Sequence, residues 1–350
     1  DEEGHADAGW GSIYDVDYLK ANVAGGEGYD WYYHSEEARA AQIRTEISDG
    51  AHGEPWVYRY KDIRGWWEHS HHDRIAGVRQ AVPTAWEPGS KPVWFTEIGC
   101  AAIDKGTNQP NKFLDEKSSE SSMPYYSTGQ RDDYIQAQYL RALTGYWDDP
   151  ANNPESEVYH GPMVDISRAH VWAWDARPFP AFPNNQELWS DGANYARGHW
   201  INGRSTSRPL ASVVREICEA AGVQAFDVSD LRGLVRGFTV DDVGEARAAL
   251  QPLMLRYGFD AVERDGVLQF LMRDGRDAVV LDEAQVAVSE DIEGRIERTR
   301  GSEAELAGRV RLQFVGADGD FETWSEEAVL PDEATHAVST SAMPLAMTRA

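Results

Sequence analysis

The sequence has little cysteine and no long apolar stretch. Its two cysteines, Cys100 and Cys218, lie in stretches that we expect to belong to different domains, which speaks against a disulfide framework or a cysteine zinc site and indicates reducing conditions. Every apolar run falls short of about 18 residues, so no membrane span is expected. The acidic start Asp1-Glu2-Glu3 lacks the basic region of a signal peptide and is not Met, so we expect a segment of a longer polypeptide.

Positive charge is also scarce. Acidic residues outnumber basic ones by 59 to 33, and the net charge of -26 repels phosphate backbones and anionic lipids. Specific nucleic-acid binding and membrane binding are therefore not expected. The 41% of hydrophobic residues and 11% of aromatic residues suffice for a packed core, and 350 residues are enough for two domains.

Aromatic residues and histidine are rare in the later part of the chain. Of 13 Trp, 15 Tyr and ten His, only Trp324, Tyr257 and His336 follow Asn202. The Gly/Ser/Thr-containing stretch 202–207 is typical of a linker. We therefore predict two domains, residues 1–203 and residues 204–350, with net charges of 17 minus 32, or -15, and 16 minus 27, or -11.

The first part has the order of a parallel α/β unit. Ser35 is expected to cap a helix that continues to Ile47, Pro55–Tyr60 to form a strand, and Arg131–Trp147 to form a second helix. Lys91–Gly99 and Val171–Asp175 are expected to be strands. Strand, long loop, helix and strand in this order indicate a parallel sheet.

The second part is predicted to be α+β with antiparallel ribbons. One amphipathic helix begins near Leu210 and ends before Gly222, and another runs from about Asp242 to Tyr257, with Gly258 at its end. Hairpins are expected around Asp265-Gly266 and between 309–315 and 321–330. No chemical motif is recognisable in this part.

Glu97 is the residue that most suggests chemistry. A carboxylate at the end of an apolar strand would lie at the C-terminal edge of a parallel barrel, where catalytic residues gather. A retaining glycoside hydrolase needs a second carboxylate about 5 to 5.5 Å away. Glu97 could equally be an ion-pairing residue at a strand end. The candidates for the second carboxylate, none with a distinguishing context, are Asp15, Asp17, Asp62 and Asp175.

Tryptophans strengthen the sugar hypothesis, because flat rings with a polar edge suit pyranose faces as well as protein cores. Trp172 and Trp174 are two residues apart and so share a strand face, while Trp66 and Trp67 lie in a loop-like stretch that could simply pack over the barrel. The run His69–Asp73 is interpreted as a solvated loop, not as a metal site, and Gly25–Gly28 as a turn. No metal and no cofactor are expected.

Several strings are specific enough to indicate a family. They are Trp31–Tyr33, Trp56–Trp67, Lys91–Gly99 and Val171–Pro183. Together they resemble the glycoside-hydrolase TIM-barrel-like domain of the large tail-tip protein of gene transfer agents. The second part, through Asp260–Glu263 and Val310–Val315, resembles the phage tail hub-type domain that follows this barrel in the same family.

The resemblance implies a role for particular residues. Glu97 would end the seventh barrel strand, where related hydrolases keep their nucleophile, and Trp174 would lie on the eighth strand as a sugar-stacking ring. The fourth strand, which would supply the acid/base, is not in the chain, and the roughly 200 residues of this part are fewer than the ~250 of a whole barrel. We therefore expect only the later strands of a TIM-barrel-like domain.

The resemblance also implies where the protein is located and what it contacts. It favours a structural component of the distal tail or baseplate of a phage-like particle, assembled in the bacterial cytoplasm. Its partners would be copies of itself, as a trimer, and other tail proteins around a DNA channel, with a host envelope glycan facing the barrel. A retaining glycoside hydrolase that uses Glu97 and a non-catalytic glycan-binding module are the alternatives, because a barrel alone does not determine function.

Overall fold

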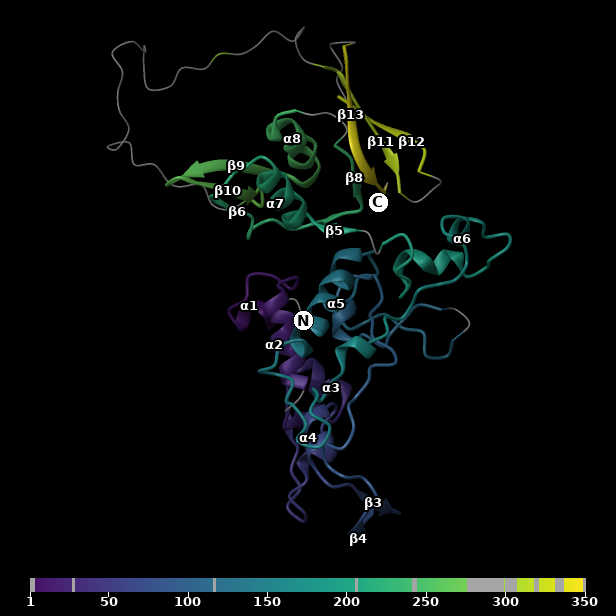
Figure 1. Cartoon of the computed structure of the whole chain (residues 1–350). Coiled ribbons are helices and arrows are strands. Elements are labelled where there is room, and N and C mark those ends of the chain that lie inside the picture. Colours follow the sequence, from purple (N-terminus) through teal and green to yellow (C-terminus); the bar gives the residue numbers. More distant parts are fainter. Residues whose placement is uncertain are drawn as a thin grey trace. The chain divides into compact units, whose positions relative to one another are not determined.

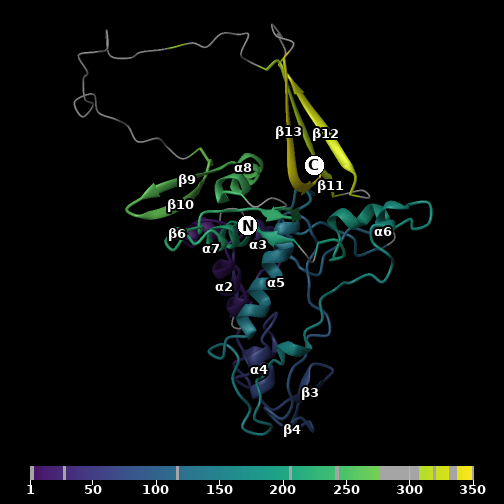
Figure 2. The ribbon, with the colours of Figure 1, turned by 45° about the horizontal axis from the view of Figure 1, so that its top comes forward.

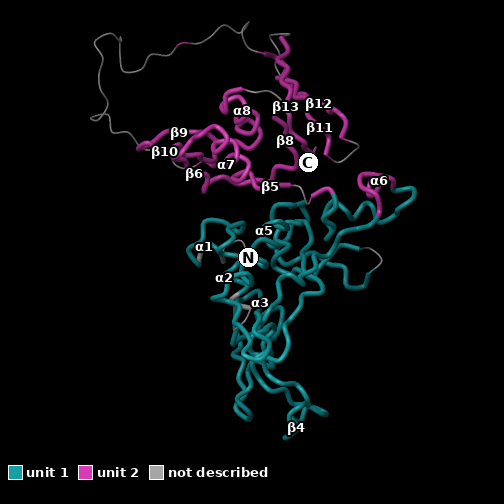
Figure 3. Tube along the Cα trace, in the orientation of Figure 1, with its two compact units in different colours: residues 1–176, 186–202 teal, residues 177–185, 203–350 magenta. Residues whose placement is uncertain are grey.

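The computed structural model describes residues 4–26, 29–115, 118–204, 207–240, 244–275, 299, 307–317, 321–330 and 337–348. Figures 1 and 2 show them in two views. The chain divides into two compact units (Figure 3): unit 1 comprises residues 1–176 and 186–202, and unit 2 comprises residues 177–185 and 203–350. The sequence-based division after residue 203 stays a prediction, since unit 2 also takes in the separate stretch 177–185.

Unit 1 consists of short helices, long loops and two small antiparallel strand pairs (Figure 1). Its α-helices are α1 (Gly4–Asp7), α2 (Val16–Gly26), α3 (Glu36–Ala40), α4 (Ile63–Glu68) and α5 (Asp133–Trp147). Its 3-10 helices are η1 (Pro55–Val57), η2 (Gly106–Asn108), η3 (Ile166–Arg168) and η4 (Gly192–Arg197). β1 (Trp31–Tyr32) pairs with β2 (Thr45–Glu46), and β3 (His72–Ile75) pairs with β4 (Val78–Pro83).

Helix α5 confirms the predicted helix at 131–147. It begins at Asp133 because the Asp132 carboxylate accepts a hydrogen bond from the Ile135 N–H at 2.9 Å, which satisfies a backbone donor of the first turn. Ile135, with Ala142, forms a small core against Leu19 of α2, while the side of α5 with Leu143, Tyr146 and Trp147 contributes to the main core of unit 1.

Three strand predictions and one helix prediction need correction. Pro55–Tyr60 is not a strand, because Pro55 opens the 3-10 helix η1. Ser35 does cap a helix, with its hydroxyl accepting from the Ala38 N–H at 3.1 Å, but this helix ends at Ala40 and the chain then turns into β2. The stretches 91–99 and 171–175 are not continuous strands either, because they form only isolated parallel bridges, Val93 with Val164 and Ile98 with Val171.

The barrel-like part of unit 1 is therefore limited. Three parts of the chain lie side by side through backbone hydrogen bonds: 93–98, 163–173, which is interrupted by η3, and 199–201. A core packs against these segments and includes Ile98 and Met163 from the segments themselves. Its other members include Trp67, Leu143 and Trp147. Among the described residues these segments do not close into a barrel.

Unit 2 contains two larger sheets with three helices among its described residues. The helices are α6 (Ala181–Asn184), α7 (Leu210–Ala220) and α8 (Ala246–Tyr257). One sheet has the order β6-β10-β9, the other β12-β11-β13-β8, and β5 pairs with β7. The strands are β5 (Arg208–Pro209), β6 (Phe226–Asp227), β7 (Leu234–Val235), β8 (Gly237–Phe238), β9 (Phe259–Arg264), β10 (Val267–Met272), β11 (Arg309–Gly316), β12 (Thr323–Val329) and β13 (Val338–Met347).

The local predictions for unit 2 are confirmed. The chain leaves α7 at Gly222 and α8 at Gly258, each with a positive φ that glycine adopts at low cost. The predicted start of α8 at Asp242 lies outside the described residues, but Gly244 and Glu245 are described and are not helical, so α8 begins later than predicted, at Ala246. Asp265 and Gly266 both have positive φ, as a type I′ turn requires, and join β9 to β10. The second hairpin pairs β11 with β12, and β11 also pairs on its other side with the unpredicted β13 (Figure 2).

A single core holds unit 2 together. Leu210, Val214 and Cys218 of α7 meet Leu253 of α8 in its centre, with both sheets contributing the remaining side chains. These further members include Phe259, Phe270, Phe314, Met343 and Leu345. Cys100 and Cys218 are both buried free thiols, each in its own unit.

Candidate functional site

Glu97 lies at the end of an extended segment of unit 1. The Val93 N–H donates to the Met163 carbonyl at 2.7 Å, and the Ile98 N–H donates to the His170 carbonyl at 2.9 Å. The Trp172 N–H returns a bond to the Ile98 carbonyl at 2.7 Å. Because the two segments run parallel, Glu97 and Trp172 are brought to the same end of the pair.

A third segment completes this edge. The Ala173 N–H donates to the His199 carbonyl at 3.0 Å, and the Ile201 N–H donates to the Ala173 carbonyl at 3.1 Å. Gly99 allows the first two segments to approach, since a Cβ at this position would lie 2.5 Å from the Trp172 carbonyl oxygen. The Trp172–Ala173 peptide bond is cis.

A cavity of about 650 Å³ opens at this edge, within the size range of ligand pockets. Its walls combine aromatic rings with carboxylates and neutral polar groups. The rings are Phe113, Tyr139, Trp172 and Trp200, the carboxylates are Glu97, Asp115 and Asp191, and the neutral polar groups include Asn111, Asn194 and His199. No Lys or Arg lines it among the described residues.

The protonation states of the walls follow from burial. Burial lowers the pKa of His199, and its Nε2 donates to the Pro110 carbonyl at 2.9 Å, so the ring is neutral near pH 7 and Nδ1 carries the lone pair. Burial raises the pKa of Tyr139, which keeps its hydroxyl protonated. Glu97 is exposed, and within the described ranges it forms no hydrogen bond or ion pair. The cavity therefore offers both acceptors and donors to a polyhydroxylated ligand.

The four tryptophans of the sugar hypothesis are not brought together. Trp172 lines the cavity and is 53% exposed, whereas Trp174 is 61% exposed but does not line it. Trp66 lies elsewhere in unit 1, with its ring centroid 4.0 Å from that of His71. Trp67 is 5% exposed in the core and donates from Nε1 to the Lys91 carbonyl at 2.8 Å, so the prediction of a sugar-binding role for it is not carried forward.

The four aspartates considered as a second carboxylate lie outside the cavity walls. Asp15 accepts from the Asp17 N–H at 2.8 Å at the start of α2, and Asp62 accepts from the Gly65 N–H at 2.7 Å at the start of α4. Asp175 exchanges hydrogen bonds with Asn202 through its backbone. Asp115 and Asp191 were missed, because both stand in irregular stretches and reach the cavity only through the fold.

The imidazole rings of the histidine run form hydrogen bonds with backbone carbonyls. His69 donates to the Gly65 carbonyl and His71 to the Trp66 carbonyl, both at 2.7 Å, and His72 donates to the Gln80 carbonyl at 3.0 Å, since a carbonyl oxygen can only accept. In the part of the chain that is described, no three His, Cys, Asp or Glu side chains are grouped as metal ligands. Nor does any described helix have the length and apolarity to cross a membrane.

Comparison with known proteins identifies both parts of the chain. Residues 1–183 match the family described as GTA TIM-barrel-like domain, and residues 245–350 match the family described as putative phage tail protein. No curated protein matches the chain. A solved chain from the "Virion of native gene transfer agent (GTA) particle" is 58% identical over 46% of this chain, with a TM-score of 0.43.

The match is partial, because it covers only 36% of the length of the virion chain. The TIM-barrel-like family, in contrast, covers 183 of the 350 residues, more than half of the chain. The chain therefore belongs to the gene transfer agent tail protein family that carries the GTA TIM-barrel-like domain, followed here by a phage tail domain.

Proposed function

We propose that the chain is a structural component of the distal tail of a gene transfer agent particle, and that unit 1 recognises a host envelope glycan. The family supports the location. The observation that supports a glycan ligand is the cavity, which is lined by Glu97, by the ring of Trp172 and by His199, whose Nε2 is already bonded to Pro110. An aromatic face suits the apolar face of a pyranose, and the carboxylate and imidazole accept hydrogen bonds from its hydroxyls.

Trp172 and Trp174 form a matched pair of variants for this proposal. Both rings are more than half exposed, but only Trp172 lines the cavity. In the intact protein, Trp172→Ala should weaken binding to purified envelope polysaccharide about tenfold, or about 1.4 kcal/mol, by removing a stacking surface. Trp174→Ala should leave the affinity within about twofold. Equal effects of the two substitutions would contradict a glycan site in the cavity.

The acidic composition fits a place around DNA. A net charge of -26 lets a like-charged duplex slide without adhesion. We propose that unit 2 assembles as a trimer with other tail proteins around the DNA path, over interfaces larger than ~1,000 Å². A particle structure in which unit 2 touches no protein neighbour would rule this out.

Hydrolysis is a second candidate function, favoured by the two further carboxylates, Asp115 and Asp191, that share the cavity with Glu97. A retaining mechanism needs a nucleophile and an acid/base. Glu97→Gln keeps the size of the side chain and removes the charge, so turnover would fall by several orders of magnitude while binding survives. We expect binding without turnover in the intact protein. Robust cleavage by the wild type that is lost in Glu97→Gln would establish the enzyme instead.

A further inference from the structure

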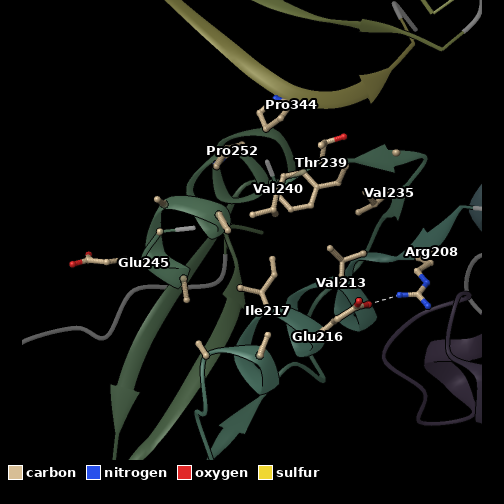
Figure 4. A pocket seen from close by; sticks show the side chains of 18 of the residues that line it. Arg208, Val213, Glu216, Ile217, Val235, Thr239, Val240, Glu245, Pro252 and Pro344 are labelled. Atoms are coloured by element: carbon tan, nitrogen blue, oxygen red, sulfur yellow. Dashed lines mark hydrogen bonds and ion pairs between the residues drawn. The ribbon is translucent and has the colours of Figure 1, made fainter. Parts of the chain in front are cut away.

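Unit 2 contains a second cavity, of about 800 Å³, that the proposed glycan site does not involve (Figure 4). It lies between α7, α8 and the backbone of residues 235–240. Arg208 of β5 and Glu216 of α7 form an ion pair at one end of it. Its walls are thus one strand edge and two helices.

The strand edge is open. β8 is the outermost strand of its sheet and pairs with β13 alone, Gly237 opposite Ala346 and Phe238 opposite Leu345. The Thr239 N–H donates to the Pro344 carbonyl at 3.1 Å. In an antiparallel pair, successive residues direct their backbone groups to opposite sides. The N–H and C=O of Phe238 and Val240 therefore point away from β13, and no partner for them is found among the described residues.

A side chain of α8 donates a hydrogen bond to β7, the strand that precedes β8. The Tyr257 hydroxyl donates to the Leu234 carbonyl at 2.8 Å, on the side of the strand that faces α8. This bond shows that α8 reaches the chain just before β8. Phe238 and Val240 are two residues apart, which is the spacing at which an edge strand presents its backbone groups to a further strand.

The side chains around the edge are apolar and small. Val213 and Ile217 of α7 point into the cavity toward Val240, which is 57% exposed (Figure 4). On the opposite wall α8 presents alanines, which leave room for the side chains of a bound segment. These are Ala246, Ala248 and Ala249.

The charge of the cavity differs from that of unit 2 as a whole. Two Arg and two Glu line it, so the lining is neutral, whereas residues 204–350 carry 16 basic and 27 acidic residues, or -11. Because its two Arg and two Glu balance, the lining offers no net complementary charge to a charged segment, whereas its Val, Ile, Ala and Pro side chains suit an uncharged apolar one.

We propose that this cavity receives an extended, uncharged apolar segment of another tail protein, which adds as a strand to the edge at Phe238 and Val240. Main-chain bonds to the edge would supply affinity, and side chains seated between α7 and α8 would supply specificity. The described edge strands of this chain fit poorly as occupants from a second copy, since β12 carries Glu326 and Glu327 and β9 carries Asp260, Glu263 and Arg264. The inference rests on the proposed function only for the location of the partner in the particle.

Amide hydrogen exchange tests the strand addition. In the free intact protein, the Phe238 and Val240 amides should exchange quickly, and in assembled particles about 100-fold or more slowly, because a new strand pairs with them. The Thr239 amide, already bonded to Pro344, should be protected in both states. If the chain is present in particles and these two amides exchange as in the free protein, the inference fails while the proposed function stands. If the chain is absent from purified particles, both fail.

Crosslinking identifies the occupant. A photoreactive residue at Ala220, which lines the cavity, should crosslink in particles to an apolar segment of a different tail protein. The same residue at the neighbouring exposed Glu219, which is not part of the lining, should not. Crosslinks from Ala220 to a second copy or to the same chain would overturn the proposed partner.

A backbone variant separates strand addition from apolar packing. Val240→Pro removes the outward N–H at a position where an edge strand tolerates proline, whereas Val240→Thr keeps both the N–H and the branched shape. Val240→Pro should lower the Ala220 crosslink yield at least tenfold and Val240→Thr should preserve it, with matching melting temperatures as evidence of folding. Equal yields for the two variants would contradict strand addition.

Discussion

Glu54 holds the two strands of the β3–β4 hairpin together through an arginine on each strand. Its carboxylate accepts from Arg74 of β3 at 2.6 Å and from Arg79 of β4 at 2.7 and 2.9 Å. An isolated two-stranded hairpin is marginal in water, so this clamp should determine how often the hairpin opens. Glu54→Gln keeps the shape of the side chain and removes the charge from both ion pairs.

The size of the effect follows from the carboxyl group itself. The hydrogen bonds from Arg79 and Arg74 lower the pKa of Glu54 from 4.5 to about 2, against the opposing effect of burial. This lowering corresponds to at most about 3 kcal/mol, and screening at the surface reduces it to about 1 to 2 kcal/mol. Hairpin opening should therefore be about 5- to 30-fold more frequent in Glu54→Gln.

The dependence on pH has a definite sign. Because the folded pKa lies below the unfolded one, the stabilisation is complete above pH 4.5 and is lost as the pH falls toward 2. Amide exchange of Ile75 and Val78, corrected for intrinsic rates, should show the full difference between wild type and variant at pH 7 and less than about half of it at pH 3. The exposed Glu68→Gln is the control. Equal opening of wild type and Glu54→Gln at pH 7 would refute the clamp.

Three further predictions concern stability and domain organisation. Asp132→Ala removes the cap of α5 and the acceptor of the Tyr14 hydroxyl at 2.7 Å, so chemical denaturation should show a loss of about 1 to 2 kcal/mol. Leu253→Ala leaves a cavity in the core of unit 2 and should cost about 2 to 5 kcal/mol, whereas Leu255→Ala, at a site 60% exposed on the same helix, should cost less than about 0.5 kcal/mol; similar losses would contradict the assignment of the core. Limited proteolysis should cut between residues 202 and 207 and release two folded fragments, and preferential cleavage within either fragment would count against that boundary.

Local chemistry made several helix boundaries and tight turns predictable, although α3 ends at Ala40 and not at Ile47. Asp132 and Ser35 bond to the backbone within their own first turns, and Asp265-Gly266 fixes a turn by its own dihedral angles. Each of these choices depends on neighbouring residues and so is readable in the sequence. β13 was not predicted, because its parallel pairing with β11 depends on residues far apart in the chain.

The candidate site shows the same limit. Glu97 follows the apolar run Val93–Phe95 and Trp172 lies within the apolar stretch Val171–Trp174, which made both visible as residues of extended segments. Tyr139, His199 and Asp191 come from separate helices and loops, and only the packing of unit 1 brings them to the cavity. Trp67 carries the same side chain as its neighbour Trp66, and only burial distinguishes the core residue from the exposed one.

The central claim is that this tail protein recognises a glycan in the cavity around Glu97. Cryo-electron microscopy of intact gene transfer agent particles, incubated with oligosaccharides from the host envelope, tests it most directly. We predict that the chain is found in the distal tail and that sugar density lies against the Trp172 ring, within hydrogen-bonding distance of Glu97 and His199. Sugar bound elsewhere on the particle with this cavity empty, or a particle without the chain, would contradict the claim.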